Sequence, residues 1–549
     1  MGPLQQRPRL DPSPHPAYSC YPPMATRFLS FDGQYAFLGK SSGDMRHRIL
    51  LGLSAVYLVA ADLIWFARDT RPPFWDMACH ESLALQVLNT FTMVGFLGVL
   101  RMLPGITGYY PPFYHSVVAL FLGVFGKSVD AARWANIPAI LLLLLATYGI
   151  GRTVLSRTSA AAAAVLANFY PLLLWLSRET MIEYWLTSLV AVAMWLLVTT
   201  EFKDRKWAVL IGVVCGLGML TKWTFGFFIL APFLWIARKN LKNAALSASV
   251  GAVISLYWYI PEISELRRFL QINNAGGIGK GDPNRLSFLS LVFYVRALEG
   301  YQIFFVLFLL FIAGAVILRK RFQSGWIPIL LWLVCGWLSL MIFRNKDPRY
   351  SVPLLPAVAL ISANVFERSR AALALTLPFL AFQHYLVSFG IPRLPEKIVL
   401  RDGVHGVLSY DWNLYSQDYF GLWGPPARED WKIQHVLDTI VSSDGRQLRL
   451  GIVPNIARFD PVAFELYIAL QNRPVTINRL WHFDAQAVSN NDFILVSEAT
   501  ESSSDFDKVL NPERGPITEY VLKRPDTFRI VERFALPNGL VIRLYKVAL

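Results

Sequence analysis

The chain is 549 residues long, 54% of them hydrophobic and 16% charged, with a mean hydropathy of +0.40. Soluble domains carry about 25% charged residues, so this composition excludes an ordinary soluble protein and predicts a polytopic membrane protein. The formal net charge is +14, but the basic residues fall in short clusters between apolar runs, as in cytoplasmic loops. A nucleic-acid partner would need a continuous basic surface and is not expected.

The first 45 residues are polar and rich in proline, as in "RPRLDPSPHPAYSCYPP". They lack the apolar core of a signal peptide, so we expect a disordered cytoplasmic tail. The chain has four cysteines, and none of them forms a CxxC pair: Cys20, Cys79, Cys215 and Cys335. Neither a disulfide framework nor a zinc cluster is indicated.

About eleven apolar runs are expected to cross the membrane. The first is 50–66, and the preceding Arg46 and Arg48 place the N-terminus inside. The run at 111–126 is short and begins with two prolines, so we expect a re-entrant or interfacial element. This choice keeps the later basic clusters inside and the C-terminus outside. The remaining spans are expected at 133–151, 158–176, 183–200, 207–220, 223–237, 243–260, 301–318, 326–343, 351–366 and 371–390.

From residue 391 the composition becomes that of a soluble domain. We expect short buried strands at 449–455 and 492–498, a helix at 461–472 and a hairpin around 537–539. The predicted fold class is therefore an all-α polytopic membrane domain (46–390) with a small C-terminal α/β domain (391–549) on the outer face. The α/β domain carries no catalytic motif, so it is expected to recognise or cover a substrate.

The expected topology gathers polar residues of both signs on the outer face. Charged groups at span ends are costly unless they are paired or face water, so each is a candidate for function, although each could also be an interfacial anchor. The set as a whole favours a site. Its members are Asp76, His80, Glu81, Arg178, Glu179, Glu183, Lys222, Arg344, Lys346, Asp347, Arg349 and Tyr350.

The stretch "WDMACHESLALQ" places Asp76 and His80 on one face of a helix that is expected to lie along the membrane surface. A carboxylate at this boundary could act as a general base between a lipid-linked donor and a polar acceptor. His80 with two carboxylates makes an incomplete metal site, and we expect it instead to orient a partner by a hydrogen bond. His115 and His384 lie in apolar stretches and are expected to be packed or interfacial.

Five stretches follow one another in this order: "WDMACHESLALQ", "YYPPFYHSVVALFLGVFG", "SRETMIEYWLTS", "GLGMLTKWTF" and "KDPRYSVPLLPAVAL". Together they resemble the GT-C glycosyltransferases that use polyprenyl-phosphate sugars, in the group of protein O-mannosyltransferases and lipid A aminoarabinose transferases. The resemblance covers about residues 48–370. It implies a GT-C-like membrane domain that is catalytic.

The resemblance also assigns roles to residues. Asp76 stands at the position of the catalytic base, although Met77 replaces the second acidic residue that often follows in the family. Glu183 matches a second catalytic acidic residue. The candidate substrate-binding residues are His80, Glu81, Arg178, Lys222, Arg349 and Tyr350. Tyr109 and Tyr110 stand where the aminoarabinose branch has an acidic–basic dipeptide, which weakens any inference about a metal or that donor.

The activity implied by the resemblance is an inverting transfer. An acceptor hydroxyl or amine, activated by Asp76, attacks the anomeric carbon, and a polyprenyl phosphate leaves. Arg349, Lys222 and Arg178 would stabilise the phosphate, with Tyr350 as a neutral donor. Glu183 would orient a cation or help to bind a divalent ion. No other cofactor is expected.

The expected partners are the lipid bilayer, a polyprenyl-phosphate-linked sugar and an envelope acceptor that is a lipid, a glycan or a protein. The expected location is a bacterial plasma (inner) membrane, with the site facing the periplasm. Three alternatives remain: a transporter or flippase for lipid-linked sugars, a scaffold whose outer domain binds a ligand, and a transferase fold without activity. The chain shows no internal repeat of the transporter type.

Overall fold

The computed structural model describes residues 42–392, 399–401, 411–413, 424–441, 446–498 and 514–548. The predicted cytoplasmic tail lies outside these residues, except for its last four, which begin the first helix. The predicted eleven spans and the α/β domain lie within them, apart from the gaps beyond residue 392.

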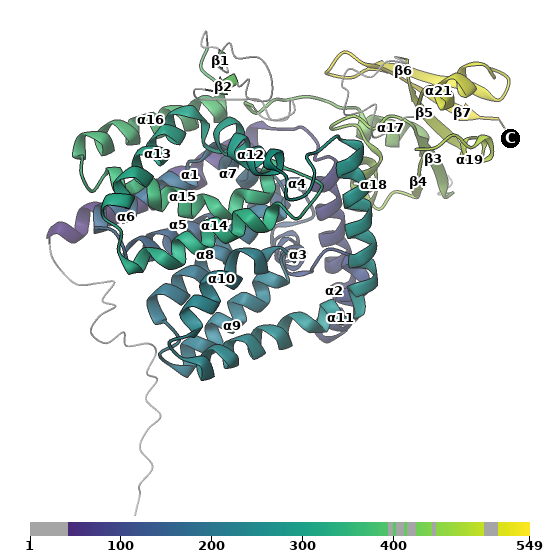
Figure 1. The fold of residues 1–549 in the computed structure, drawn as a ribbon. Helices are drawn as coiled ribbons and strands as arrows, with labels where there is room; N and C mark the ends of the chain where they lie inside the picture. Colours follow the sequence, from purple (N-terminus) through teal and green to yellow (C-terminus); the bar gives the residue numbers. More distant parts are fainter. Residues whose placement is uncertain are drawn as a thin grey trace, which may run out of the picture. The chain divides into compact units, whose positions relative to one another are not determined.

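The membrane domain is entirely helical among the described residues (Figure 1). Its first half consists of α1 (Ser42–Arg68), α2 (Trp75–Thr107), α3 (Phe113–Phe125), α4 (Val129–Trp134), α5 (Ile137–Gly151), α6 (Arg157–Asn168), α7 (Pro171–Arg178) and α8 (Ile182–Thr200). Its second half consists of α9 (Arg205–Met219), α10 (Phe225–Ala237), α11 (Leu241–Gly279), α12 (Phe288–Ala297), α13 (Phe304–Lys320), α14 (Ile327–Leu340), α15 (Leu355–Ser362) and α16 (Arg370–Phe389). Four short helical turns complete it: η1 (Leu298–Ile303), η2 (Ser324–Trp326), η3 (Pro348–Leu354) and η4 (Ala363–Val365).

The described chain has seven helical segments that are long and apolar enough to cross a membrane, or eight if α6 and α7, bent by 58°, form one span. The chain is thus a multi-pass membrane protein. Three apolar helical segments are shorter: α3, α10 and Ser324–Leu340. The total of eleven spans therefore remains a prediction, as does the side of the membrane on which the C-terminus lies.

Two helices differ from the prediction. A helix lying along the membrane surface was expected around Asp76, and α2 is a helix of 33 residues that begins at Trp75. It has a break at Gly95, whose φ of 70° glycine adopts without a steric penalty. Its exposed face includes Phe96 and Leu97, an apolar surface that the polar start of the helix obscured in the sequence. Helix α11 extends to Gly279, well beyond the predicted end at residue 260. These two long helices contact each other (Figure 1).

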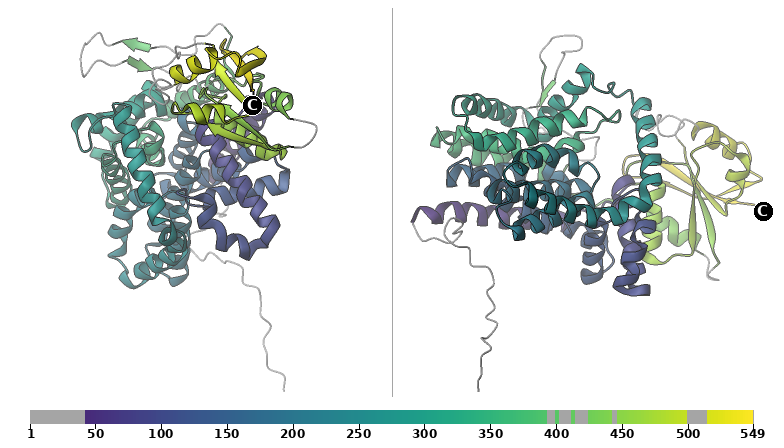
Figure 2. Two further views of the ribbon diagram at one scale, coloured as in Figure 1. Left: turned by 90° about the vertical axis from the view of Figure 1, so that its right-hand side faces the viewer. Right: turned by 60° about the horizontal axis from the view of Figure 1, so that its bottom comes forward.

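The C-terminal domain is built on a five-stranded sheet of order β4-β3-β5-β7-β6 (Figure 2). Strand β3 (Leu448–Ile452) pairs in parallel with β4 (Val475–Arg479) and β5 (Phe493–Ser497). Strand β7 (Val541–Val547) pairs antiparallel with β5 and with β6 (Phe528–Ala535), which confirms the predicted hairpin. The predicted strands at 449–455 and 492–498 correspond to β3 and β5. Strand β4 was not predicted, although its sequence VTINR alternates apolar and polar residues.

Side chains of the sheet alternate between two apolar layers, as in a sheet covered on both faces. Leu495 packs with α17 (Ile433–Ile440) and α18 (Pro461–Gln471), and the latter is the predicted helix. Ile494 and Val496 pack on the other face with α19 (Ala485–Ser489) and α21 (Arg514–Leu522). A separate antiparallel pair, β1 (Val399–Arg401) and β2 (Asp411–Asn413), lies between the two domains in sequence.

A buried ion pair joins three helices of the membrane domain. The Nε of Arg178, on α7, donates to Oδ1 of Asp62, on α1, at 2.8 Å, and Nη2 donates to the Ser388 hydroxyl, on α16, at 2.7 Å. The Ser177 hydroxyl donates to the other Asp62 oxygen at 2.7 Å. Both charged side chains are at most 3% exposed. The pair is therefore buried and bonded across three helices, which gives Arg178 a role in helix packing.

We predict that Arg178→Ala lowers the free energy of unfolding by about 3–5 kcal/mol, because it leaves Asp62 buried without a cation. The Asp62→Leu/Arg178→Leu double variant should recover most of that loss. Thermal unfolding in detergent measures both. Arg473→Ala, which removes an exposed partner of Asp438, is the control and should cost at most about 1 kcal/mol. An Arg178→Ala protein that unfolds like wild type and fails only to bind donor lipid would restore Arg178 to the substrate site.

Candidate functional site

Four segments far apart in sequence bring charged groups together. Asp76 lies in the first turn of α2 and Glu183 in the first turn of α8. Lys222 lies between α9 and α10, and Arg349 lies in η3. Arg349 and Asp76 make a direct contact, and Glu183 lies close enough to Lys222 and Arg349 to be influenced by both charges. We call Asp76, Glu183, Lys222, Arg349 and Tyr350 the boundary cluster.

The orientation of Arg349 depends on Asp347. Asp347 caps η3 by accepting a hydrogen bond from the backbone N–H of Arg349 at 2.8 Å. Its carboxylate also accepts from the guanidinium, from Nε at 3.1 Å and from Nη2 at 2.9 Å. The outer nitrogens of the guanidinium point to Asp76, with both Nη atoms 3.4 Å from Oδ2. Asp347 therefore fixes the guanidinium, and Asp76 adds a longer and weaker contact.

Asp76 is the accessible member of the boundary cluster. Its side chain is 52% exposed, whereas that of Arg349 is 16% exposed. A carboxylate with a long ion pair and access to solvent can exchange its partner at little cost, because exposed ion pairs contribute at most about 1 kcal/mol. Asp76 is thus the more accessible of the two carboxylates in the boundary cluster.

The second pair is more buried. The Lys222 ammonium donates to Oε1 of Glu183 at 2.8 Å, and the Glu183 side chain is only 5% exposed. The other carboxylate oxygen of Glu183, Oε2, is buried and has no hydrogen-bond partner among the described residues. An unsatisfied buried acceptor costs about 1–3 kcal/mol of stability. Oε2 is therefore an atom to which a bound ligand could donate a hydrogen bond.

Tyr350 lies beneath the second pair. Its ring centroid is 5.0 Å from the Lys222 ammonium, within the range of a cation–π contact. Burial and the charge of Asp347 raise the pKa of the Tyr350 phenol, so the hydroxyl keeps its proton. Tyr350 can therefore act as a neutral hydrogen-bond donor.

His80 reaches a partner that the sequence did not identify. Its Nδ1 lies 3.0 Å from Nε2 of His115, and both rings are buried. The His80 ring also contacts Tyr110, with centroids 4.7 Å apart. His80 is influenced by the charges of Glu183 and Lys222, so it borders the boundary cluster. The prediction that His115 is packed is correct, but spacing alone gave no signal of the histidine pair.

Glu81 and Arg178 do not join the boundary cluster. Glu81 is buried, accepts a hydrogen bond from the Thr180 hydroxyl at 2.7 Å and lies near Arg133 and Glu179. Arg178 is bonded to Asp62, as described above. The structure therefore does not bring these two residues to the boundary cluster, and their predicted role in substrate binding stays a prediction.

Two further cations of the predicted outer set also face elsewhere. Lys346 is buried, donates to the carbonyl of Leu340 at 3.0 Å and lies over the Tyr294 ring. Burial lowers the pKa of the Lys346 ammonium to about 8, and the charge of Asp282 opposes this shift. Arg344 donates to the amide oxygen of Asn284. Neither cation is bonded to the boundary cluster.

A metal site is not assembled by the side chains that the structure describes. These residues contain no group of three or more His, Cys, Asp or Glu side chains placed to bind a metal ion. His80 pairs with His115 and not with two carboxylates. We therefore derive no chemistry from a metal.

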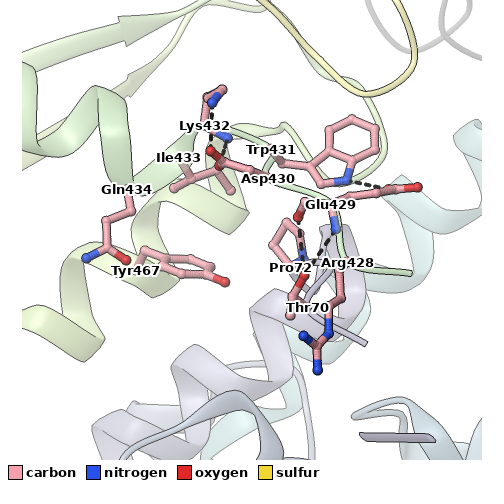
Figure 3. A pocket seen from close by; sticks show the side chains of 10 residues that line it. All are labelled: Thr70, Pro72, Arg428, Glu429, Asp430, Trp431, Lys432, Ile433, Gln434 and Tyr467. Carbon is pink, nitrogen blue, oxygen red and sulfur yellow. Dashed lines mark hydrogen bonds and ion pairs between the residues drawn. The ribbon is translucent and has the colours of Figure 1, made fainter. Parts of the chain in front are cut away.

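A separate pocket of about 410 Å³ opens beside the loop between α1 and α2 (Figure 3). It is lined by Thr70, Pro72, Tyr467 and residues 428–434. Its polar side chains are largely paired with each other: Lys432 with Asp430 at 2.7 Å, and the Trp431 indole with Glu429 at 2.9 Å. It shares no residue with the boundary cluster, and we do not assign the chemistry to it.

Residues 110–264 match the family described as dolichyl-phosphate-mannose-protein mannosyltransferase. The undecaprenyl phosphate-alpha-4-amino-4-deoxy-L-arabinose arabinosyl transferase 1 of Pseudomonas fluorescens is 24% identical over 348 residues, which are 59% of this chain and 59% of that protein. The transferase of Pseudomonas paraeruginosa with the corresponding name is 25% identical over 60% of this chain and 61% of its own length. The chain thus matches about three fifths of the length of these relatives.

Two solved structures have the same fold. The crystal structure of ArnT from Cupriavidus metallidurans bound to undecaprenyl phosphate superposes with a TM-score of 0.53 at 14% identity, covering 89% of this chain and 97% of that one. The oligosaccharyltransferase of Archaeoglobus fulgidus gives 0.51 at 12% identity, covering 92% and 74%. The family match, the relatives and the shared fold agree with the resemblance to GT-C glycosyltransferases that the sequence indicates.

Proposed function

We propose that this protein is a membrane glycosyltransferase that moves a sugar from a polyprenyl-phosphate-sugar donor to an acceptor. The observation that carries the proposal is the boundary cluster, in which an accessible carboxylate lies against an oriented guanidinium beside a second carboxylate–ammonium pair. The names of the relatives support it, since they are transferases named for an undecaprenyl-phosphate-linked sugar.

The reaction needs a base on one side of the anomeric carbon and cations on the other. Asp76 takes the proton from the acceptor hydroxyl or amine as the new bond to the anomeric carbon forms. The bond from that carbon to the phosphate oxygen breaks, and its electron pair stays on the departing polyprenyl phosphate. Attack from the side opposite the leaving group inverts the anomeric configuration.

Arg349 suits the departing phosphate. A guanidinium presents a planar fork that binds two phosphate oxygens at once, and Asp347 already fixes its plane. Because the Asp76 contact is long, a phosphate can replace it on the outer nitrogens. Donor binding then releases Asp76 for the acceptor, so that one event prepares both the base and the leaving-group site.

Lys222 and Tyr350 supply further stabilisation. As the phosphate gains charge, the ammonium and the phenol hydroxyl strengthen their interactions with it, which lowers the barrier. Glu183 keeps Lys222 in position. The unpartnered Oε2 of Glu183 is available to accept a hydrogen bond from a hydroxyl of the donor sugar.

The names of the relatives support an undecaprenyl-phosphate-linked sugar as the donor. The acceptor in this proposal is an envelope component. In this proposal the protein lies in a bacterial inner membrane, and its active site and C-terminal domain face the periplasm. The placement of the basic clusters supports this orientation.

We predict that Asp76→Asn lowers the rate of sugar transfer by about 10²–10⁴-fold, because the amide cannot accept the proton. The assay follows radiolabelled sugar from polyprenyl-phosphate sugars with purified protein in detergent. Asp438→Asn is the matched control, since Asp438 is also 52% exposed and paired with an arginine. Turnover by folded Asp76→Asn at the rate of the control would remove Asp76 from the role of base.

We predict that Arg349→Ala lowers turnover by about 10²–10³-fold, which is the effect of removing one hydrogen-bond donor from a developing anion. Arg349→Lys should recover only part of the rate, because the ammonium keeps the charge and loses the fork. Steady-state kinetics with varied donor measure both variants. Full activity of Arg349→Ala would show that Arg349 only pairs with Asp347. Donor binding without transfer by wild type with every donor and acceptor class would favour the flippase alternative.

A further inference from the structure

The segment that leads into Asp76 lies against a loop of the C-terminal domain, residues 455–460. The indole N–H of Trp75 donates to the amide oxygen of Asn455 at 2.8 Å. The backbone N–H of Trp75 donates to Oδ2 of Asp460 at 3.4 Å. Arg458 donates to the carbonyl of Pro72 at 3.3 Å. Three side chains of one domain thus bond to two residues of the other, Pro72 and Trp75.

The backbone on both sides of this contact is strained. Trp75 has φ of 44° and Arg458 has φ of 71°, in the left-handed region that side-chain-bearing residues rarely adopt. Such conformations persist only where the surroundings determine them, and they are typical of functional sites. The strained Trp75 directly precedes Asp76, so its conformation sets the direction in which α2 begins.

The Asp460 side chain contacts the first turns of two helices, α18 and α2. Its side chain is fully buried and caps α18 by accepting from the backbone N–H groups of Val462 and Ala463. Helix α18 also packs against α2. The same carboxylate therefore caps the start of α18 and accepts a hydrogen bond from the first residue of α2. It holds the starts of the two helices together.

The other end of the α1–α2 loop is also bonded to the C-terminal domain. The backbone N–H of Thr70 donates to the carbonyl of Ala427 at 3.0 Å, and Ala427 donates to Asp69 at 3.2 Å. Arg71 donates to the carbonyl of Pro425 at 3.1 Å. The loop that precedes Asp76 is thus bonded to the C-terminal domain at both of its ends.

We propose that Asn455 and Asp460 are positioning residues of the active site: they hold Trp75 in its left-handed conformation and thereby direct the Asp76 carboxylate towards Arg349. The inference rests on the proposed function, in which Asp76 is the base. If Trp75 relaxed into the right-handed region, its φ would change from positive to negative, and the first turn of α2 would rotate relative to residues 72–74. Asp76 would then leave its position opposite Arg349.

The test uses the full-length protein with Asn455→Ala, Asp460→Ala and Asp460→Asn. Asn455→Ala removes only the bond to the indole, so it remains informative if Asp460→Ala fails to fold. Asp460→Asn keeps one oxygen, which can still accept from the N–H groups that cap α18, and replaces the oxygen that faces Trp75 with an amide N–H donor. Asp484→Ala is the matched control, because Asp484 caps α19 in the same domain by accepting from the N–H of Gln486 at 2.9 Å.

Two quantities are measured in each variant: hydrogen exchange of the peptide covering residues 72–80, and kcat and KM for the donor. We expect Asp460→Ala to speed this exchange and lower kcat at least tenfold, with KM changed less than threefold. Asn455→Ala should do the same to a smaller extent. Asp460→Asn should speed exchange and lower kcat in the same direction as Asp460→Ala while α18 keeps its cap, and Asp484→Ala should change neither quantity.

Unchanged exchange in Asn455→Ala and Asp460→Ala would overturn the inference, and so would faster exchange with an unchanged kcat. In the second case the loss of activity in Asp76→Asn would still stand, so the failure of the positioning role is separate from the failure of the proposed function. An equal loss of kcat in Asp484→Ala would also overturn it, since that effect would come from domain stability alone.

Discussion

Charged groups in a membrane domain are costly unless they are paired or face water, and the ion pairs of this domain differ in how tightly they are bonded. Arg178 and Asp62 are bonded to each other and to two serine hydroxyls, and both side chains are buried. Arg349 is bonded firmly to Asp347 and only at 3.4 Å to Asp76, which remains half exposed. The first pair joins helices. The second can open when an anion with a better geometry arrives.

The fold delivers the boundary cluster through the ends of its helices. Asp76 and Glu183 lie in the first turns of α2 and α8, and Arg349 lies in the short turn before α15. In the proposed mechanism, a lipid-linked phosphate and an acceptor meet at these helix ends. Among the described residues, the C-terminal domain contributes bonds to the loop before Asp76 and no member of the cluster itself. Its proposed role is therefore to position Asp76.

Much of this could be predicted from the sequence, because composition and apolar runs report burial directly. The membrane helices, the α/β domain and its hairpin follow from such patterns, and the family resemblance selected five residues that the structure brings together. Other features depend on contacts between distant segments. Asp62 lies inside an apolar run, and nothing local indicates that it takes Arg178. The length of α2 was obscured by its polar start, and neither the histidine pair nor the left-handed Trp75 has a signature in spacing.

The central claim is that Asp76 and a phosphate compete for Arg349. The most direct test is the affinity of polyprenyl phosphate for wild type, Asp76→Asn and Arg349→Ala, measured in the same detergent without acceptor. The account predicts that Asp76→Asn binds the lipid phosphate more tightly than wild type, since a competing negative charge is gone, and that Arg349→Ala binds it more weakly. Weaker binding by Asp76→Asn, or equal binding by all three proteins, would contradict it.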